Sequence, residues 1–507
     1  AIVAAGADKD SLIYTMALTT QSTTDALATA KALMASKVPQ MLEDALVNGI
    51  PAIGVEDIGM SVANILAPYP EGHELFDENI IPQELVPLYS SANFMQGSIT
   101  LPYYLGVPKF DEDGELIADT ADAPLNGWWK SLCDSGAILA GVAGKIAAGE
   151  LPAETIPTDA VSVDDGTCQA LGLRSLGFDT KRHLTKYSPV PKANADMAIT
   201  VQMTTPDVAV ANDVREDLKL PTNLVEPENG WPVVILQHGI TSKKEDMLAI
   251  TGILSIYGFA TVAIDHPLHG SRGFDTDMDG IDDINASTVS ATDYMNLASL
   301  LTTRDNLRQS TSDLLGLRLG MNFLGGEHAE GDAINIDTSK VHFLGHSLGA
   351  ITGINFIGLT NTALDPEVDP LFAVNTNSLA MPGVMVANFL LESGAFGGLV
   401  KSSLAYAASP DFQGFVALAH QGAEDPTADP TEAEMVGYYQ SFYALLTPEQ
   451  QAGLDGTFAA FAFAAQTVTD AGDPANYAAM MAATSTPTHL IEVIGNGSDN
   501  LSDQVIP

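Results

Sequence analysis

Residues 341–349 read VHFLGHSLG, and this stretch decides the fold. It begins as a short apolar run with strand character and ends, at residues 345–349, in the pattern G-x-S-x-G. The next ten residues, AITGINFIGL, are typical of a helix. A strand, a sharp turn with serine at its apex and a helix form the context of a nucleophile elbow. The pattern therefore predicts that Ser347 is a nucleophile, with a chance match as the alternative in a chain that holds 44 glycines.

Such a turn places further requirements on its neighbours. The serine at the apex has a strained backbone, so nothing larger than glycine fits two residues to either side, at Gly345 and Gly349. The hydroxyl then stands clear of the sheet edge, and the N–H of Leu348 points at the reacting carbonyl. We therefore expect Leu348 to supply one of the two N–H donors that hold an oxyanion.

The second donor is expected after another strand. Residues 232–240, PVVILQHGI, form a continuous apolar run that suits a buried parallel strand, and Gly239 lets the backbone approach closely. We assign the second oxyanion donor to the N–H of Ile240. His238 invites assignment as the catalytic base, but a histidine just before this loop is more often a hydrogen-bond partner that stabilises the loop.

The rest of the chain supports a parallel α/β sheet. A chain of 507 residues is too long for one compact core, so two or three units are expected. Strand-like and helix-like segments alternate from about residue 195 to 383, which indicates right-handed crossovers between parallel strands. Residues 1–182 are expected to form an N-terminal accessory domain, with strands at 11–20 and 97–108, and residues 183–507 to form the domain that carries Ser347.

The alternation stops after residue 383. Residues 384–485 are rich in Ala, Phe and Leu at helical spacing, and the next strand is expected within PTHLIEVIG at 487–495. A helical insertion at this place would cover Ser347 as a lid does and offer an apolar surface above it. A purely structural helical layer is the alternative.

Acyl transfer by a serine also needs an acid and a base, in the chain order Ser, Asp or Glu, His. Asp503, in the sequence DQVIP, has the carboxylate–apolar–Pro pattern expected of the orienting acid, and Asp499 is the alternative. None of the ten histidines follows Asp503. We therefore expect the chain to be truncated at its C-terminus and the base to come from a segment absent from it. Recruitment of His420 or His489 is the alternative.

Composition limits the partners and the compartment. Lys and Arg number 21 against 64 Asp and Glu, a net charge of −43, so no basic stripe for nucleic acid is expected. No run of eighteen uncharged apolar residues predicts a membrane span, and Ala1 is expected to be a processed or cut end. Cys133 and Cys168 are the two cysteines and fit a single disulfide of an exported protein, with two buried free thiols as the alternative.

An acidic loop is a second candidate site. The sequence DTDMDGIDD at 275–283 matches D-x-D-x-D-G with a further Asp at the ninth position, the oxygen-rich chemistry of a Ca²⁺ loop. Position twelve is Ala286 instead of a bidentate Glu, so a full EF-hand is excluded. Free acidic loops are common in so acidic a chain. The candidate metal ligands are Asp275, Asp277, Asp279 and Asp283.

At this point the chain resembles a known family, the large exported bacterial lipases and lysophospholipases with a bacterial virulence factor lipase N-terminal domain. The matching stretches are TTQSTTDAL (19–27), PVVILQHGIT (232–241), AIDHPLHGSRGF (263–274), YMNLASLLTTRDNLRQS (294–310), FLGHSLGAITG (343–353) and DQVIP (503–507). The resemblance implies an α/β-hydrolase with a serine nucleophile that acts on carboxylic esters of lipids, at the cell surface or outside the cell. Family members extend further at both ends, and the triad histidine is expected beyond DQVIP.

The sequence thus predicts an α/β-hydrolase fold with a mostly parallel sheet, a helical lid insertion and an N-terminal accessory domain. Its predicted activity is a lipase or (lyso)phospholipase reaction through an acyl-enzyme on Ser347, with Asp503 orienting an off-chain histidine. A lipid ester is the expected substrate, and no cofactor is required beyond a possible structural Ca²⁺. A short-chain esterase and a non-enzymatic lipid-binding surface protein are the alternatives.

Overall fold

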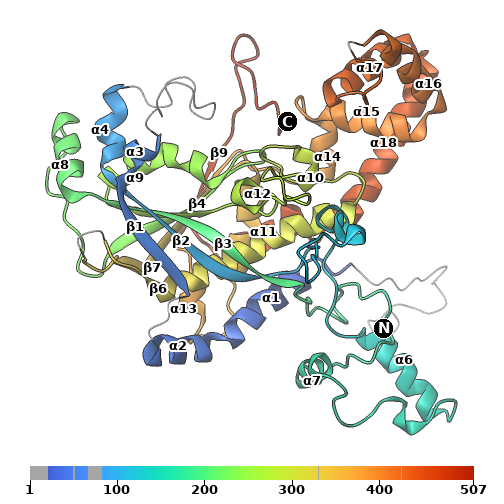
Figure 1. Cartoon of the computed structure of the whole chain (residues 1–507), viewed down its shortest axis with the longest axis horizontal. Helices are drawn as coiled ribbons and strands as arrows, with labels where there is room; N and C mark the ends of the chain where they lie inside the picture. The colour runs from blue at the N-terminus through green and yellow to red at the C-terminus, as the bar shows by residue number, and fades with distance from the viewer. Residues whose placement is uncertain (1–20, 49–51, 67–82, 329–330, 424, 507) are drawn as a thin grey trace, which may run out of the picture.

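A computed structural model describes residues 21–48, 52–66, 83–328, 331–423 and 425–506. Its centre is a nine-stranded sheet with the strand order β6-β1-β2-β3-β5-β4-β7-β8-β9 (Figure 1). The strands are β1 (Ile53–Ser61), β2 (Ala92–Tyr103), β3 (Ala195–Pro206), β4 (Trp231–Gln237), β5 (Ala260–Ile264), β6 (Leu324–Gly325), β7 (Ile336–His346), β8 (Thr376–Ala380) and β9 (Thr488–Ile491). The predicted strand at 11–20 lies outside the described residues.

Strand direction divides the sheet into two parts. β5, β4, β7, β8 and β9 run parallel to one another, whereas β2 pairs antiparallel with both β1 and β3, and β3 is antiparallel to β5. The short edge strand β6 pairs parallel with β1. The carboxyl ends of the five parallel strands therefore meet at one edge, where open α/β sheets place their sites. This order, with the nucleophile turn after β7, is that of an α/β-hydrolase, and the predicted fold class is confirmed.

Both faces of the sheet are covered, as continuous apolar strands require. In β4, Val233 and Ile235 pack into the core cluster that also contains Leu315 of α11, whereas Val234 and Leu236 pack into a cluster on the other face with Met247. The helices before the insertion are α1 (Asp25–Ser36), α2 (Val38–Val47), α3 (Val62–Leu66), α4 (Val86–Ser90), α5 (Ala123–Asn126), α6 (Gly136–Ala147), α7 (Val163–Ala170), α8 (Val208–Asp217), α9 (Thr251–Ile256), α10 (Ala291–Tyr294), α11 (Leu300–Gly320), α12 (Leu348–Thr360) and α13 (Asp369–Phe372).

The sheet crosses the predicted domain boundary near residue 182. β1 and β2 precede that boundary, yet β2 pairs with β3 from Ala92 opposite Pro206 to Tyr103 opposite Ala195. The first part of the chain thus contributes strands to the hydrolase sheet. What stands apart in Figure 1 is a smaller lobe around α6 and α7, which the Cys133–Cys168 disulfide crosslinks with an S–S distance of 2.12 Å. The predicted disulfide is therefore confirmed.

The helical insertion at 384–485 projects from the body beside the carboxyl edge of the sheet (Figure 1). Its helices are α14 (Val386–Glu392), α15 (Gly397–Ala408), α16 (Pro410–Ala419), α17 (Glu432–Leu445), α18 (Pro448–Thr469) and α19 (Ala478–Ala483). Phe389, Phe412 and Phe458 belong to one apolar cluster, which also contains Leu348 and Ile351 of the elbow helix. The insertion therefore packs directly on the helix that follows Ser347.

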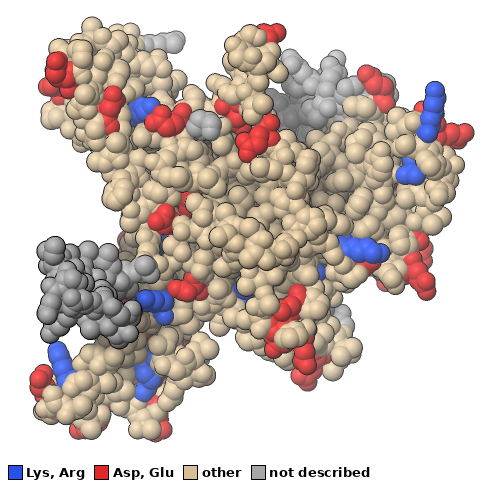
Figure 2. Space-filling model, turned by 180° about the vertical axis from the view of Figure 1, so that it is seen from behind, with Lys and Arg blue, Asp and Glu red and all other residues tan. Residues whose placement is uncertain are grey.

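Two further features are the distribution of surface charge and the length of the helices. On the face shown in Figure 2, acidic side chains lie in small scattered groups with basic ones between them. Within the described ranges, the helices include none with the length and apolar character needed to cross a membrane.

Candidate active site

Ser347 occupies the sharp turn between β7 and α12. Its backbone angles are φ 52° and ψ −116°, a conformation that L residues rarely adopt and that costs about 1–3 kcal/mol. The turn is fixed by hydrogen bonds on both sides: Ser347 N–H donates to Ala380 O at 2.8 Å, and Ile351 N–H donates to Ser347 O at 2.9 Å. The geometry is that of the nucleophile elbow predicted from the sequence.

Close backbone contacts explain the glycines of the motif. A Cβ on Gly345 would lie 2.4 Å from Gly349 O, and a Cβ on Gly349 would lie 2.3 Å from Gln237 O. A Cβ on Gly239 would lie 3.1 Å from Ser347 Cβ, so the loop after β4 passes directly beside the serine. Because the obstructing atoms at Gly345 and Gly349 belong to the backbone, neither position can take a side chain without moving the strands.

Two backbone amides at this place are free to bind an anion. Leu348 is the first residue of α12, so its N–H has no acceptor within the helix. Neither Leu348 N–H nor Ile240 N–H donates to another described residue. Both residues line the same pocket as Ser347. Their role as the two oxyanion donors stays a prediction.

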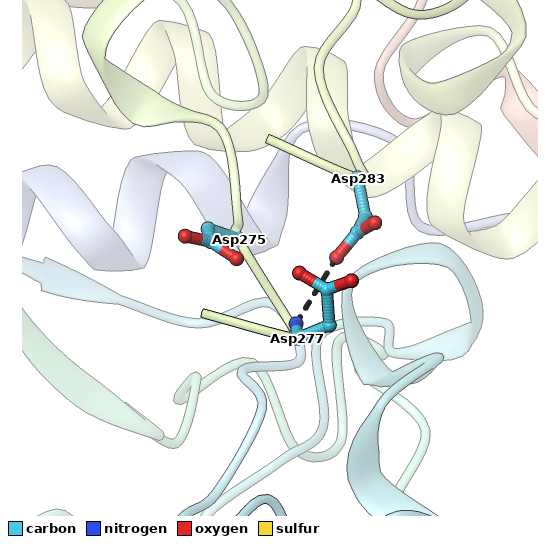
Figure 3. Close-up of side chains that lie close together, drawn as sticks. All are labelled: Asp275, Asp277 and Asp283. Atoms are coloured by element: carbon cyan, nitrogen blue, oxygen red, sulfur yellow. Dashed lines mark hydrogen bonds between the residues drawn. The ribbon is translucent and has the colours of Figure 1, made fainter. Parts of the chain in front are cut away.

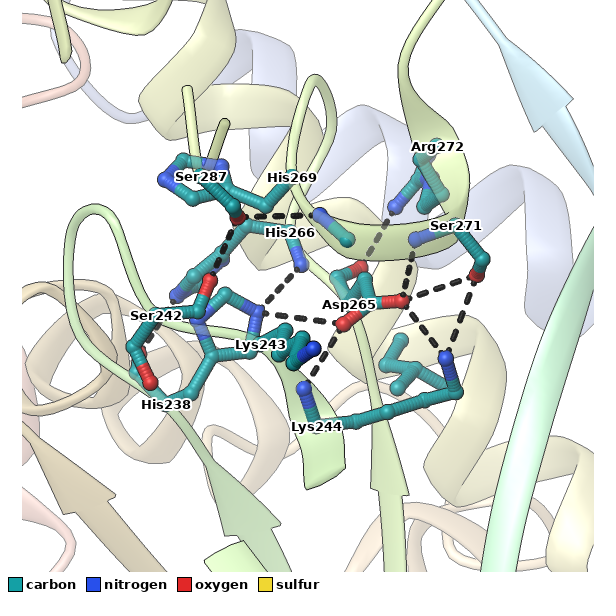
Figure 4. A network of polar contacts seen from close by, with 12 residues as sticks. His238, Ser242, Lys243, Lys244, Asp265, His266, His269, Ser271, Arg272 and Ser287 are labelled. Atoms are coloured by element: carbon teal, nitrogen blue, oxygen red, sulfur yellow. Dashed lines mark hydrogen bonds and ion pairs between the residues drawn. The ribbon is translucent and has the colours of Figure 1, made fainter. Parts of the chain in front are cut away.

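The loops that carry this site rest on a buried polar network at the ends of β4 and β5 (Figure 4). Its centre is the buried Asp265 carboxylate, which accepts hydrogen bonds from Lys244 N–H (2.7 Å), Lys244 Nζ (2.8 Å) and the N–H and hydroxyl of Ser271 (3.0 and 2.8 Å). Burial raises the pKa of the Asp265 carboxyl, but the charge of the Lys244 ammonium and the hydrogen bonds from Lys244, together with the other polar neighbours, lower it more, so the group is held ionised. Gly270 lies against this carboxylate, since a Cβ there would be 2.6 Å from it.

Three buried histidines surround the network. His238 Nδ1 and Gly239 O lie 2.7 Å apart, His266 N–H donates to His238 Nε2 at 3.0 Å, and His269 Nδ1 lies 2.9 Å from Pro267 O. Burial lowers the pKa of His238 and of His266, and it lowers the pKa of His269 to about 3. All three are therefore neutral at pH 7, and His238 contacts the loop instead of Ser347, as the sequence indicated.

The pocket in front of Ser347 is almost wholly apolar. The unfilled space between its lining atoms is about 550 Å³, part of which is open to solvent. Apart from Ser347 and Thr292, the lining side chains are apolar: Ile240, Ala291, Met295, Leu297, Leu348, Ile351, Phe389, Leu390, Phe396, Leu399, Val400, Val505 and Ile506. Five of them, Phe389 to Val400, come from the helical insertion. The insertion therefore forms a wall of the pocket, as expected of a lid.

Asp503 lies in the segment that closes the pocket at another side. Its Oδ1 accepts the N–H groups of Val505 (2.8 Å) and Ile506 (3.0 Å), and both of these residues line the pocket. Its Oδ2 accepts no hydrogen bond from the described residues. Asp499, the alternative acid, is exposed and bonds only to its own turn, through Asn496 and Ser498. Asp503 is thus the better placed of the two carboxylates.

No described histidine makes a hydrogen bond with the Ser347 hydroxyl. His420 contacts Tyr438 OH (3.2 Å) and Ala428 O (2.9 Å) within the insertion, and His489 lies 3.4 Å from Ser378 Oγ on the sheet. The exposed ring of His346 packs against Gly239, where a Cβ would lie 3.2 Å from its Nδ1. His73 lies outside the described residues. Neither His420 nor His489 is therefore engaged as the base in this structure.

The acidic loop forms a compact turn closed by the antiparallel bridge between Phe274 and Ile284. Ligand atoms of Asp275, Asp277 and Asp283 lie within 4.8 Å of one another (Figure 3), and Asp279 is outside this group. Oδ1 of Asp275 is buried without a hydrogen-bond partner in the described part of the chain. Calcium binding by this loop stays a prediction from the sequence.

Sequence reasoning missed the residues that support the site. The alternating pattern gives Lys244, Asp265 and His266 no role, although the stretch AIDHPLHG at 263–270 gathers a carboxylate and two histidines at a strand end. The pocket wall formed by Thr292, Met295 and Leu297 was also missed. These residues precede α11 in a short polar–apolar segment whose spacing gives no signal of its position.

Comparison with solved structures gives distant similarities. Acetyl xylan esterase 1 from Thermoanaerobacterium sp. matches with a TM-score of 0.22 and 16% identity over 49% of this chain and 60% of that one. An acetyl xylan esterase from Paenibacillus sp. matches with a TM-score of 0.25 and 13% identity over 58% and 72%. A lipase in its open form matches with a TM-score of 0.23 and 16% identity over 58% and 84%.

These similarities are low, and the chain spans only 60% of the Thermoanaerobacterium esterase. No protein-family model and no curated protein matches the chain. The fold assignment therefore rests on the strand order and the elbow themselves.

The contact of Gly349 with β4 gives the first testable prediction. In Gly349→Ala the new Cβ would meet Gln237 O, so we expect about 1–3 kcal/mol of destabilisation and loss of the reactivity of Ser347. Thermal unfolding and reaction of Ser347 with a fluorophosphonate measure the two effects. Gly414→Ala in α16, where no atom lies within 4 Å of the new Cβ, is the control and should be neutral or stabilising. Equal behaviour of the two variants would contradict the close-contact explanation.

Calcium binding can be tested with the same thermal unfolding measurement. If the loop binds Ca²⁺, a concentration of 100 Kd stabilises the protein by about 2.7 kcal/mol, so the Tm should rise with Ca²⁺ and fall with a chelator. Asp283→Asn should abolish this response, because Asp283 is one of the three clustered carboxylates. Asp411→Asn, on the exposed side of α16, is the matched control and should keep it. A wild-type Tm that does not respond to Ca²⁺ would rule out the site.

Proposed function

We propose that the protein is a carboxylic-ester hydrolase that acts on lipid esters through an acyl-enzyme on Ser347. The single observation that carries this proposal is the strained elbow at Ser347 beside two unoccupied backbone N–H groups, those of Ile240 and Leu348. Hydrogen-bond donors that are already in place where negative charge develops stabilise the transition state, and this is usually the largest single contribution to the rate of enzymatic acyl transfer. An apolar pocket opens directly on this hydroxyl.

The reaction follows from these groups. Ser347 Oγ attacks the ester carbonyl and loses its proton to a base, while the two amides hold the oxyanion of the tetrahedral intermediate. The alcohol leaves with that proton, and the acyl group remains on Oγ. A water molecule, deprotonated by the same base, then attacks the acyl-enzyme and releases the carboxylic acid.

For the base we propose a histidine supplied from outside residues 1–507, either by a further segment or by a separate piece of the protein. Two observations support this: His420 and His489 bond elsewhere, and Oδ2 of Asp503 accepts no hydrogen bond from the described residues and can accept an imidazole N–H. Asp503 would fix the tautomer and the orientation of that ring. Rearrangement of His420 or His489 is the alternative source.

The pocket supports a fatty acyl chain as the part of the substrate that it binds. Thirteen apolar side chains and one threonine surround the hydroxyl, so the transfer of a long alkyl group from water into this pocket is favourable, by about 0.8 kcal/mol per buried methylene. A lipase or (lyso)phospholipase fits this surface. A short-chain esterase would use the same chemistry with a tighter pocket. A non-enzymatic lipid-binding protein would keep the pocket without a reactive serine.

We also propose an extracellular or cell-surface location and membership of the bacterial lipase family that the sequence resembles. The Cys133–Cys168 disulfide supports an oxidising compartment.

Covalent labelling of Ser347 tests the proposed chemistry. We expect a fluorophosphonate to add once per chain, at Ser347, because phosphonylation needs the same nucleophile and the same two donors. Intact mass and peptide mapping of the protein as it is exported measure the adduct, and Ser347→Ala should remove it. Ser402→Ala, a buried serine of α15, is the control and should be labelled like wild type. An unlabelled wild-type protein would favour the lipid-binding alternative.

Substitution in the pocket wall tests the acyl chain. Leu399 of α15 is half-buried and lines the pocket, so Leu399→Trp should remove room for about two methylenes. At about 0.8 kcal/mol per methylene, esters of long acids should lose roughly tenfold in kcat/KM relative to acetate and butyrate esters. A series of p-nitrophenyl esters of increasing chain length measures this, with Leu418→Trp, at a side chain 72% exposed in α16, as the control. A wild-type preference for acetate, unchanged in Leu399→Trp, would favour the short-chain esterase.

A further inference from the structure

His238 is a buried residue at the carboxyl end of β4, next to the carboxyl end of β5. It directly follows β4, and its side chain has no exposed surface. The adjoining peptide, from Gly239 to Ile240, carries the N–H assigned to the oxyanion. This peptide is therefore the link between a buried ring and the reacting atoms.

Hydrogen bonds determine the tautomer of the ring. Nε2 of His238 accepts the backbone N–H of His266 at 3.0 Å, so its lone pair is not available for a proton; the Asp265 carboxylate is farther from this nitrogen, at 3.7 Å. The proton of the neutral ring must then be on Nδ1, which lies 2.7 Å from Gly239 O and donates to it. In the opposite direction, Nε2 of His266 lies 3.0 Å from His238 O, so the two residues hold each other across β4 and β5.

The orientation of Gly239 C=O determines the orientation of Ile240 N–H, because both belong to the same peptide. The peptide between Gly239 and Ile240 is planar and trans, so its C=O and its N–H point in opposite directions. Nδ1–H of His238 holds Gly239 O on the buried side, where Ser242 N–H contributes a second, longer contact of 3.4 Å. The N–H of Ile240 therefore points away from the side on which Gly239 O is held, and Ile240 lines the same pocket as Ser347.

The loop needs such a restraint. Thr241, the next residue, has φ 62°, in the left-handed region that residues other than glycine avoid. Relief of this strain at Thr241 would rotate the Ile240–Thr241 peptide and disturb Ile240, so the Gly239–Ile240 peptide before it needs a restraint of its own. Gly239 has no side chain to resist rotation of that peptide, and it lies in contact with Ser347.

We propose that His238 is a positioning residue that sets the oxyanion donor: its Nδ1–H keeps the Gly239–Ile240 peptide in the orientation that presents Ile240 N–H to the substrate oxygen. His266 supports it by fixing the tautomer. The inference rests on the proposed function for its effect on rate, but the hydrogen-bond arrangement itself does not depend on that function.

Asparagine and glutamine at position 238 separate this role from general packing. The amide nitrogen of Asn occupies nearly the position of Nδ1 and can donate to Gly239 O, whereas that of Gln reaches the position of Nε2. We expect His238→Gln and His238→Ala to lose about 10²-fold in kcat, the effect of removing one oxyanion donor, with little change in KM. His238→Asn should recover most of that loss. Affinity for a trifluoromethyl ketone, which forms a tetrahedral adduct, should fall in parallel with kcat.

A second measurement keeps the inference testable if a variant misfolds. Nitrogen-15 NMR of histidine-labelled wild-type protein should show His238 protonated on Nδ1 and unprotonated on Nε2. The opposite tautomer would overturn the inference, and so would equal losses in His238→Asn and His238→Gln, or a His238→Ala variant with wild-type kcat. A wild-type protein in which Ser347 does not react at all would instead overturn the proposed function, while the tautomer would still report on His238.

Discussion

The close approach of two strand ends is the constraint on which the site depends. Gly349 touches the end of β4 and Gly345 touches Gly349, so the backbone at Ser347 is held at φ 52° by contacts that leave no room for relaxation. The same contacts bring the loop at Gly239 beside the serine. Strain at the nucleophile and the position of the oxyanion donor thus have one origin, the packing of backbone against backbone between β4 and β7.

Apolar side chains lie on one side of Ser347, and a buried polar network lies on the other. The helical insertion and the segment at Val505 and Ile506 form apolar walls in front of the hydroxyl. Behind it, the buried charges of Asp265 and Lys244 compensate each other and hold the loops. Burial keeps His238, His266 and His269 neutral, so no positive charge of theirs competes with the amides for an oxyanion.

Much of this could be predicted because the elbow is a local motif. The residue pattern around Ser347 fixes a strand, a turn and a helix within twenty positions, and short-range sterics then require the glycines. The order of the strands could not be predicted in the same way. β2 joins the sheet through pairing with β3 at a separation of about a hundred residues, and β1 joins it through β2. The sequence therefore predicts an accessory domain at 1–182, where the sheet instead continues. The partners of Asp265 were likewise invisible, because Lys244 and Ser271 meet only after β4 and β5 pair.

The central claim is that the hydroxyl of Ser347 and the amides of Ile240 and Leu348 converge on one reacting carbonyl. The most direct measurement is a crystal structure of the protein after reaction with an alkyl phosphonate. The account predicts phosphorus bonded to Ser347 Oγ, the phosphoryl oxygen within hydrogen-bond distance of both amide nitrogens, and the alkyl chain in the pocket. A phosphoryl oxygen directed away from both amides, or an adduct on any other residue, would contradict it.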